Sequence, residues 1–118
     1  MGNTSRYYTI NLTSGVATAI GSTSFTPAIT LTFASIDFNP TVDRIRLVTN
    51  NGQNLRLNPE TGLVASTDLP INGGSSPVIT SIAYTNSVAG TATTELFDVD
   101  ATTGKLYKQV PPNDGTLV

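Results

Sequence analysis

A chain of 118 residues is enough for one domain with a modest core. Threonine is the commonest residue, at 20 positions, and serine and asparagine supply ten each, which favours strands and turns. Only 12% of the residues are charged and the net charge is −2, so we expect neither nucleic acid nor a membrane as a partner. Cysteine and histidine are absent, which excludes disulfides and removes the usual zinc ligands and general base. No cofactor is therefore expected.

Alternation of apolar and polar residues predicts about nine or ten strands and no long helix. Nine strands can be placed, at residues 6–12, 15–21, 30–38, 43–49, 53–58, 62–66, 77–85, 93–99 and 104–110. These strands predict an all-β fold made of antiparallel hairpins.

Two short phrases recur along the chain. A strand that runs into a Thr/Ser-Gly turn occurs at residues 8–15, 55–62 and 97–104. A Ser-Ile phrase occurs at 34–38 and again at 80–84. The turn glycines are 47 and 42 residues apart, a spacing typical of propeller blades. We therefore divide a single domain, 1–118, into partial repeats at approximately 6–29, 30–76 and 77–118, with structural turns at Gly15, Gly52, Gly62 and Gly104.

The hairpin around Asn50-Asn51-Gly52 tests the strand register. A two-residue turn would mix arginine with leucine on both faces of the hairpin. A three-residue loop with left-handed Gly52 instead pairs Ile45 with Leu57 and Leu47 with Leu55. We predict the three-residue loop, which gathers Arg44, Arg46 and Arg56 on the opposite face.

Nine or ten strands make only about two and a half propeller blades, whereas a closed ring needs about four to eight. The end blades of such a fragment would expose apolar faces and strand edges. We therefore predict β-propeller-type blades of antiparallel strands, with the ring completed by oligomerisation. A homodimer is favoured and a trimer is the alternative. A monomeric sandwich or open meander is the other fold considered.

Long segments carry a family resemblance: residues 36–50 and 52–62, followed by 83–86, 96–100 and 111–117. In them the chain resembles the bacterial family catalogued as domain of unknown function 4394. The resemblance implies a propeller-type repeat protein, about half the length of a typical member, in an extracellular or cell-surface setting. It implies no catalytic residue.

Arg44, Arg46 and Arg56 form the densest group of positive charge. Clustered guanidinium groups can hold a carboxylate, sulfate or phosphate. The favoured interpretation is an exposed, charged ribbon face, neutralised by Asp43 and Glu60.

Asp98 and Asp100 lie two residues apart before a glycine turn, which loosely resembles a calcium-binding loop. The third acid and the distal glutamate of such a loop are missing. Capping of the turn by Asp100 explains the pattern better, because Asn11 and Asn58 occupy the equivalent positions.

These observations favour a non-enzymatic structural or binding module that assembles with itself and presents loops to a glycan or protein ligand. One alternative is a monomeric, sandwich-like binding domain. The other is a hydrolase that uses the carboxylates of Asp98 and Asp100, which we rank last because no histidine or cysteine is present to activate a nucleophile.

Overall fold

The computed structural model describes residues 4–30 and 33–118, which form nine strands in three antiparallel sheets. The first sheet contains β1 (Tyr8–Ile10) and β2 (Ala17–Ala19); the second contains β3 (Ala34–Asn39), β4 (Arg44–Thr49), β5 (Asn54–Leu57) and β6 (Val64–Thr67); the third contains β7 (Ile79–Tyr84), β8 (Leu96–Asp100) and β9 (Lys105–Gln109). One turn of 3-10 helix, η1 (Pro112–Asp114), follows β9. The described residues contain no α-helix, so the predicted all-β class is confirmed.

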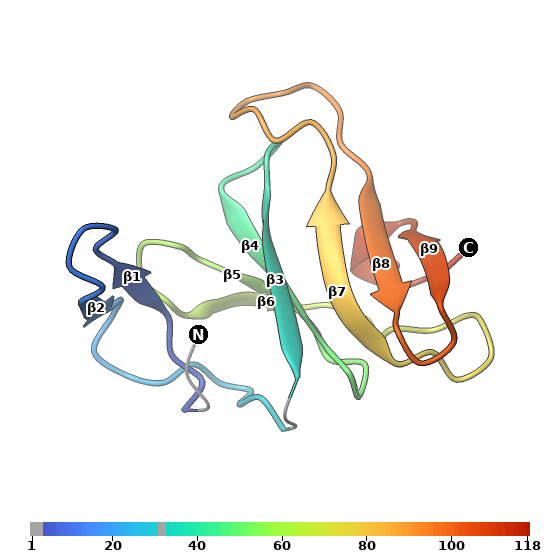
Figure 1. Ribbon diagram of the computed structural model, residues 1–118, viewed down its shortest axis with the longest axis horizontal. Coiled ribbons are helices and arrows are strands. Elements are labelled where there is room, and N and C mark those ends of the chain that lie inside the picture. The colour runs from blue at the N-terminus through green and yellow to red at the C-terminus, as the bar shows by residue number, and fades with distance from the viewer. Residues whose placement is uncertain (1–3, 31–32) are drawn as a thin grey trace.

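Each of the nine predicted strands has a counterpart, although the observed strands are shorter. Residues 31 and 32 of the strand expected at 30–38 lie outside the described residues. The three sheets follow one another in chain order across the molecule (Figure 1). β3 of the second sheet lies beside β7 of the third, so the second and third sheets meet along these two strands.

The three repeated turns share one hydrogen-bond pattern. In each hairpin a side-chain oxygen of Asn11, Asn58 or Asp100 accepts hydrogen bonds from the backbone N–H groups two and three residues later, at 2.8–3.2 Å. This geometry is the Asx turn, and it confirms the predicted capping role of Asp100.

All four predicted turn glycines have a left-handed backbone, with φ of 71° at Gly15, 87° at Gly52, 70° at Gly62 and 69° at Gly104. This region strains residues that carry a Cβ atom. Gly62 is also confined by the segment that follows β2, because a Cβ atom there would lie 2.8 Å from the carbonyl oxygen of Ile20.

The register of β4 and β5 is the one expected for a three-residue loop. Ile45 pairs with Leu57 and Leu47 pairs with Leu55, while the N–H of Gly52 donates to the carbonyl of Thr49 at 2.9 Å. The prediction is therefore confirmed. The second sheet consequently has one aliphatic face and one face that carries the arginines.

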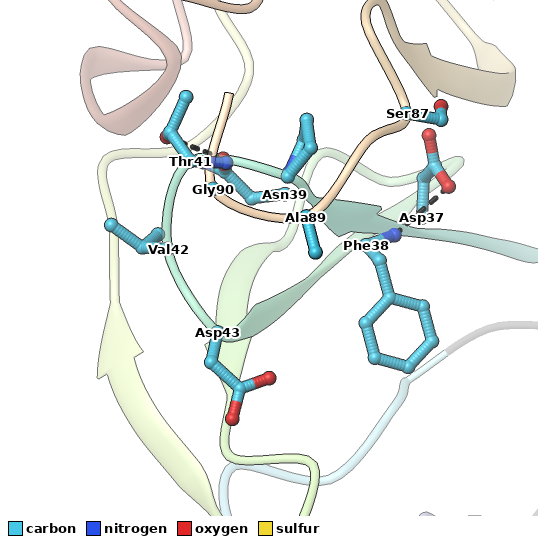
Figure 2. Close-up of a pocket in the computed structure, with 10 residues that line it drawn as sticks. Asp37, Phe38, Asn39, Thr41, Val42, Asp43, Ser87, Ala89 and Gly90 are labelled. Atoms are coloured by element: carbon cyan, nitrogen blue, oxygen red, sulfur yellow. Dashed lines mark hydrogen bonds between the residues drawn. The ribbon is translucent and has the colours of Figure 1, made fainter. Parts of the chain in front are cut away.

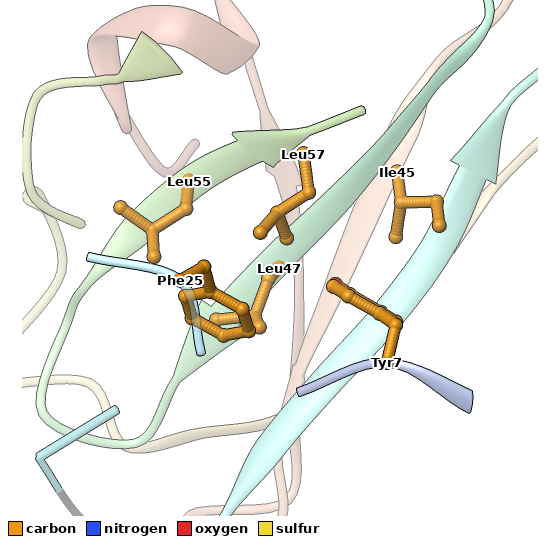
Figure 3. Packing of buried hydrophobic residues seen from close by; sticks show 6 residues of the cluster. All are labelled: Tyr7, Phe25, Ile45, Leu47, Leu55 and Leu57. Carbon is orange, nitrogen blue, oxygen red and sulfur yellow. The ribbon is translucent and has the colours of Figure 1, made fainter. Parts of the chain in front are cut away.

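The aliphatic face packs against the N-terminal segment (Figure 3). Tyr7 and Phe25 lie over this face with their ring centroids 5.8 Å apart. The buried residues of this first core are Tyr7, Phe25, Ile45, Leu47, Leu55 and Leu57.

A second core lies between the second and third sheets, and its buried residues are Val48, Ile79, Ile82, Tyr84, Leu96 and Leu117. Two side chains of β3 also bind the backbone of β7. Ser35 Oγ accepts from the N–H of Ile82 at 2.9 Å, and Asp37 Oδ2 accepts from the N–H of Tyr84 at 2.6 Å. The sheets are thus joined by apolar packing and by hydrogen bonds.

Equivalent residues of the two Ser-Ile phrases differ in burial. Ile82 and Tyr84 on β7 are buried, whereas Ile36 and Phe38 on β3 are 39% and 57% exposed. The second sheet covers β7, but the two-stranded first sheet leaves this part of β3 uncovered. The neighbouring sheet, and not the local sequence, decides which of these apolar side chains is buried.

At the outer edge of the third sheet, the C-terminal end of β9 pairs with the C-terminal segment of the chain. Lys108 and Val118 exchange two backbone hydrogen bonds of 2.9 Å, and the N–H of Leu117 donates to the carbonyl of Asn72 at 2.9 Å. These contacts also hold the connection between β6 and β7, which contains Asn72, against the C-terminal segment. The outer face of the third sheet, which carries Val99 and Leu106, is exposed.

Leu57→Ala is expected to lower the free energy of unfolding by about 2–5 kcal/mol, because Leu57 is fully buried in the first core. Leu69→Ala removes the same atoms from an exposed side chain and serves as the control. Urea unfolding monitored by circular dichroism measures both changes. Equal midpoints for the two variants would contradict the assigned core.

Candidate functional site

Arg46 is buried between the second and third sheets, with 1% of its surface exposed. Its guanidinium group donates from Nη1 to Asn54 at 2.8 Å and to Asp68 at 2.6 Å. Nη2 donates to Asn113 Oδ1 at 2.7 Å, and Nε donates to the hydroxyl of Tyr84 at 3.2 Å. A buried charge requires partners of this kind, since it has lost its contacts with water.

Arg56 shares the same carboxylate from the more exposed side of the cluster. Its Nε and Nη2 donate to the two oxygens of Asp68, each at 2.8 Å, and its side chain is 33% exposed. Burial raises the pKa of Asp68, but hydrogen bonds from Arg56 and Arg46 outweigh it and hold the pKa below its ordinary value. Two arginines therefore share one ionised carboxylate.

The predicted alignment of the three arginines on one face is confirmed by the strand register. The expected exposed ribbon is wrong for Arg46, because the third sheet covers it. Asp43 and Glu60 form no salt bridge in the described structure, and Asp68 pairs with both inner arginines instead. The spacing in the sequence could have indicated Asp68 as the partner. Ser66 lies opposite Arg56 in the β5–β6 pair, and Asp68 follows Ser66 by two residues, on the same side.

A cavity of about 340 Å³ opens over this cluster between the second and third sheets. Arg46, Arg56 and Tyr84 form its polar floor, and the β3–β4 turn and the segment around η1 form its walls. Its lining residues outside the floor are Asn39, Thr41, Val42, Thr94, Pro111, Pro112 and Asn113.

Asp98 is fully buried on the inner face of the third sheet, in register with Ile82 and Tyr107. Neither of its carboxylate oxygens has a hydrogen-bond partner in the described structure. Burial raises the pKa of Asp98 to about 7, although the positive charge of Arg46 acts in the opposite direction.

Asp100 lies on the same face, but its environment is different. Hydrogen bonds from the side chain of Thr102 and from backbone N–H groups, including that of Val78, lower the pKa of Asp100 to about 2. These donors already occupy its oxygens. Among the described residues, no three acidic side chains come together as a metal site. The arrangement of Asp98 and Asp100 thus corresponds to a turn cap beside a buried carboxyl group.

A second cavity, of about 520 Å³, lies at the far end of β3 (Figure 2). The β7–β8 loop crosses this end of the strand, and the N–H of Gly90 donates to the carbonyl of Pro40 at 2.9 Å. Phe38, Val42 and Ala89 supply apolar surface, and the remaining lining residues are Asp37, Asn39, Pro40, Thr41, Asp43, Ser87 and Gly90. Sequence reasoning missed this cavity because it is formed by two distant loops.

The sequence model of one family, described as domain of unknown function DUF4394, matches residues 1–118. The chain belongs to this family. The suggested membership in the DUF4394 family is thereby confirmed over the whole sequence. No curated protein and no solved structure matches the chain. In the described part of this DUF4394 domain, no helix has the length and apolar character needed to cross a membrane.

Asp98→Asn is expected to reduce the loss of stability that occurs as the pH rises from about 4 to 7. The pKa of Asp98 is raised in the folded state, so its protonated form favours folding at low pH. This contribution decreases once the carboxyl group of the unfolded chain ionises, near pH 4, and is lost by about pH 7. Thermal unfolding at pH 4, 5.5 and 8 compares the variant with the wild type. Asp43→Asn, at an exposed position, controls for the change in net charge, and parallel profiles for Asp98→Asn and the wild type would contradict the assignment.

Arg46→Met is expected to lower the free energy of unfolding by about 3–5 kcal/mol. The substitution leaves the buried acceptors, including Asn54 and Asn113, without their hydrogen-bond donor. Arg44→Met removes a guanidinium group that, among the described residues, donates to the backbone oxygen of Asp43 alone, and it should cost less than about 1 kcal/mol. Denaturant unfolding of both variants gives the comparison. A loss at Arg46 no larger than that at Arg44 would refute the role of the buried cluster.

Proposed function

We propose that this chain is a non-enzymatic structural module whose three sheets are propeller-type blades and whose copies associate into a closed ring. The observation that carries this proposal is the apolar outer face of the third sheet. Inside the chain, consecutive sheets bury aliphatic residues against one another. On the outer face of the third sheet, no layer from the described residues covers Val99 and Leu106.

Along β8, side chains point alternately to the buried inner face and to the outer face of the third sheet. Val99 pairs with Ser81 and Leu106, and the side chains of Val99 and Leu106 are 37% and 66% exposed. Phe97, two residues before Val99, lies on the same side and is half-buried. Neighbouring exposed apolar side chains of this kind favour association with another surface.

The first sheet offers a matching surface at the other end of the stack. Tyr7 faces the first core, so alternation along the strand directs Tyr8 and Ile10 outwards. Ile10 is 54% exposed and pairs with Ala17, and Tyr8 pairs with Ala19. Small and apolar side chains thus form the outer face of the first sheet.

Packing of the third sheet of one copy on the first sheet of the next is a head-to-tail contact. Two copies joined in this way at both ends form a closed, two-fold ring of six sheets, within the usual range of about four to eight blades, whereas three copies form a ring of nine. We favour the homodimer. A ring also leaves the loop cavity at the end of β3 available to a glycan or protein ligand in an extracellular or cell-surface setting.

Leu106→Glu is expected to convert the assembly into monomers, because it places a charge on the apolar outer face, beside Val99. Light scattering coupled to size-exclusion chromatography measures the mass at about 1–100 μM. The control is Val88→Glu, which adds the same charge at an exposed apolar residue of the β7–β8 loop and should leave the mass unchanged.

A wild-type protein that remains a folded monomer across this concentration range would overturn the proposal. Equal dissociation by Leu106→Glu and Val88→Glu would also count against it, since the outer face would then have no special role. Circular dichroism of each variant shows that a change in mass does not arise from unfolding.

A further inference from the structure

We propose that the 340 Å³ cavity over Arg46 and Arg56 binds a small ligand through a carboxylate group. This site does not depend on ring assembly, because one copy of the chain supplies every residue of its lining. The inference rests on the charge of the cluster and on the hydrogen-bonding groups that remain unused around it.

The cluster has an excess of positive charge. Arg46 and Arg56 carry two positive charges, and Asp68 supplies one negative charge to both, which leaves one positive charge. Asp37, opposite Arg46 in the sheet, binds the backbone of Phe38 and β7 instead and forms no salt bridge in the described structure. The remaining charge lies next to the cavity, where Arg56 is partly exposed.

The unused polar groups that face the cavity are mainly donors. Arg56 uses Nε and Nη2 for Asp68 and Ser66, so both N–H groups of its Nη1 remain without an acceptor in the described structure. Tyr84 accepts a hydrogen bond from Arg46, and its own hydroxyl proton has no acceptor among the described residues. The side-chain Nδ2 of Asn113 likewise has none there.

The neighbouring acceptors are already occupied. Asn113 Oδ1 accepts from Arg46, and Asn39 Oδ1 accepts from the backbone and hydroxyl of Thr41. The carbonyl of Pro112 accepts from the side chains of Asn54 and Gln109. A ligand group that accepts several hydrogen bonds and donates none therefore fits the lining of this cavity better than a neutral group that donates.

A carboxylate matches both the excess positive charge and the unused hydrogen-bond donors of the cavity. It carries a single negative charge, equal to the excess on the cluster, and its two oxygens can accept from the guanidinium, hydroxyl and amide donors together. The volume of about 340 Å³ lies within the range of small-ligand sites. The ligand class is a small carboxylic acid, either an acidic sugar or a compound that resembles the end of a peptide.

Isothermal titration at pH 6 with D-glucuronate, N-acetylglycine, glucose and sodium sulfate tests the site. At this pH the carboxyl group of Asp98, with a pKa of about 7, is mainly uncharged, so it does not neutralise the nearby Arg46. We expect glucuronate or N-acetylglycine to bind and glucose not to bind. The carboxylate that binds more tightly identifies the source as sugar or peptide. Binding of sulfate alone, or of no compound, would overturn the proposal.

Asn113→Asp is the most selective variant because it keeps the oxygen that accepts from Arg46 and replaces only the Nδ2 donor. The new carboxylate also neutralises the excess charge, so affinity for the ligand should fall by about tenfold or more. Arg56→Gln removes the Nη1 donors and should have a similar effect. Arg44→Gln is the matched control, since Arg44 lies on the same sheet face but does not line the cavity, and it should change affinity by less than about twofold.

Equal weakening by Arg44→Gln and Asn113→Asp would show that only the overall charge matters and would overturn the assigned site. Unchanged affinity in Asn113→Asp would do the same. Thermal unfolding of each variant accompanies the titrations. If Arg56→Gln does not fold, Asn113→Asp decides the outcome, because it retains the contact with Arg46.

Discussion

The burial of one guanidinium group constrains much of this structure. Arg46 is 1% exposed, and its hydrogen bonds go to acceptors from four separate parts of the chain instead of to water. They are supplied by Asn54 on β5, Asp68 after β6, Tyr84 on β7 and Asn113 in η1. Because the loss of solvation of a buried charge is costly, the third sheet and the C-terminal segment are held where these acceptors meet. The directional hydrogen bonds of this cluster fix the relative positions of the elements that supply them.

The second sheet thus makes two different contacts. Its aliphatic face, represented by Leu47 and Leu57, forms an apolar core with the N-terminal segment. Its other face combines Val48 with the arginine cluster and leaves a cavity near the β3–β4 turn. The outer faces of the end sheets carry exposed apolar side chains, whereas the space between the second and third sheets contains the arginine cluster. The proposed assembly and ligand sites therefore use different surfaces of the chain.

Local patterns predicted the strands and turns well. Alternation located all nine strands, and the requirement for one aliphatic face selected the register around Gly52. The common capping role of Asn11, Asn58 and Asp100 also followed from the repeats, because an Asx turn involves only neighbouring residues. The same reasoning treated Ile36 and Ile82 as equivalent, although only Ile82 is buried.

The amino-acid sequence by itself determined the all-β class, the hairpin turns and the face of the second sheet on which Arg46 lies, because hydrogen bonding and side-chain alternation act over a few residues. Only the tertiary structure decided that Arg46 is buried and that Asp68 is its carboxylate partner. The same holds for Asp98, whose carboxyl group has no hydrogen-bond partner among the described residues. These properties depend on which sheet covers which face. Residues far apart in the chain come into contact between the sheets, and these contacts set their solvation and their pKa values.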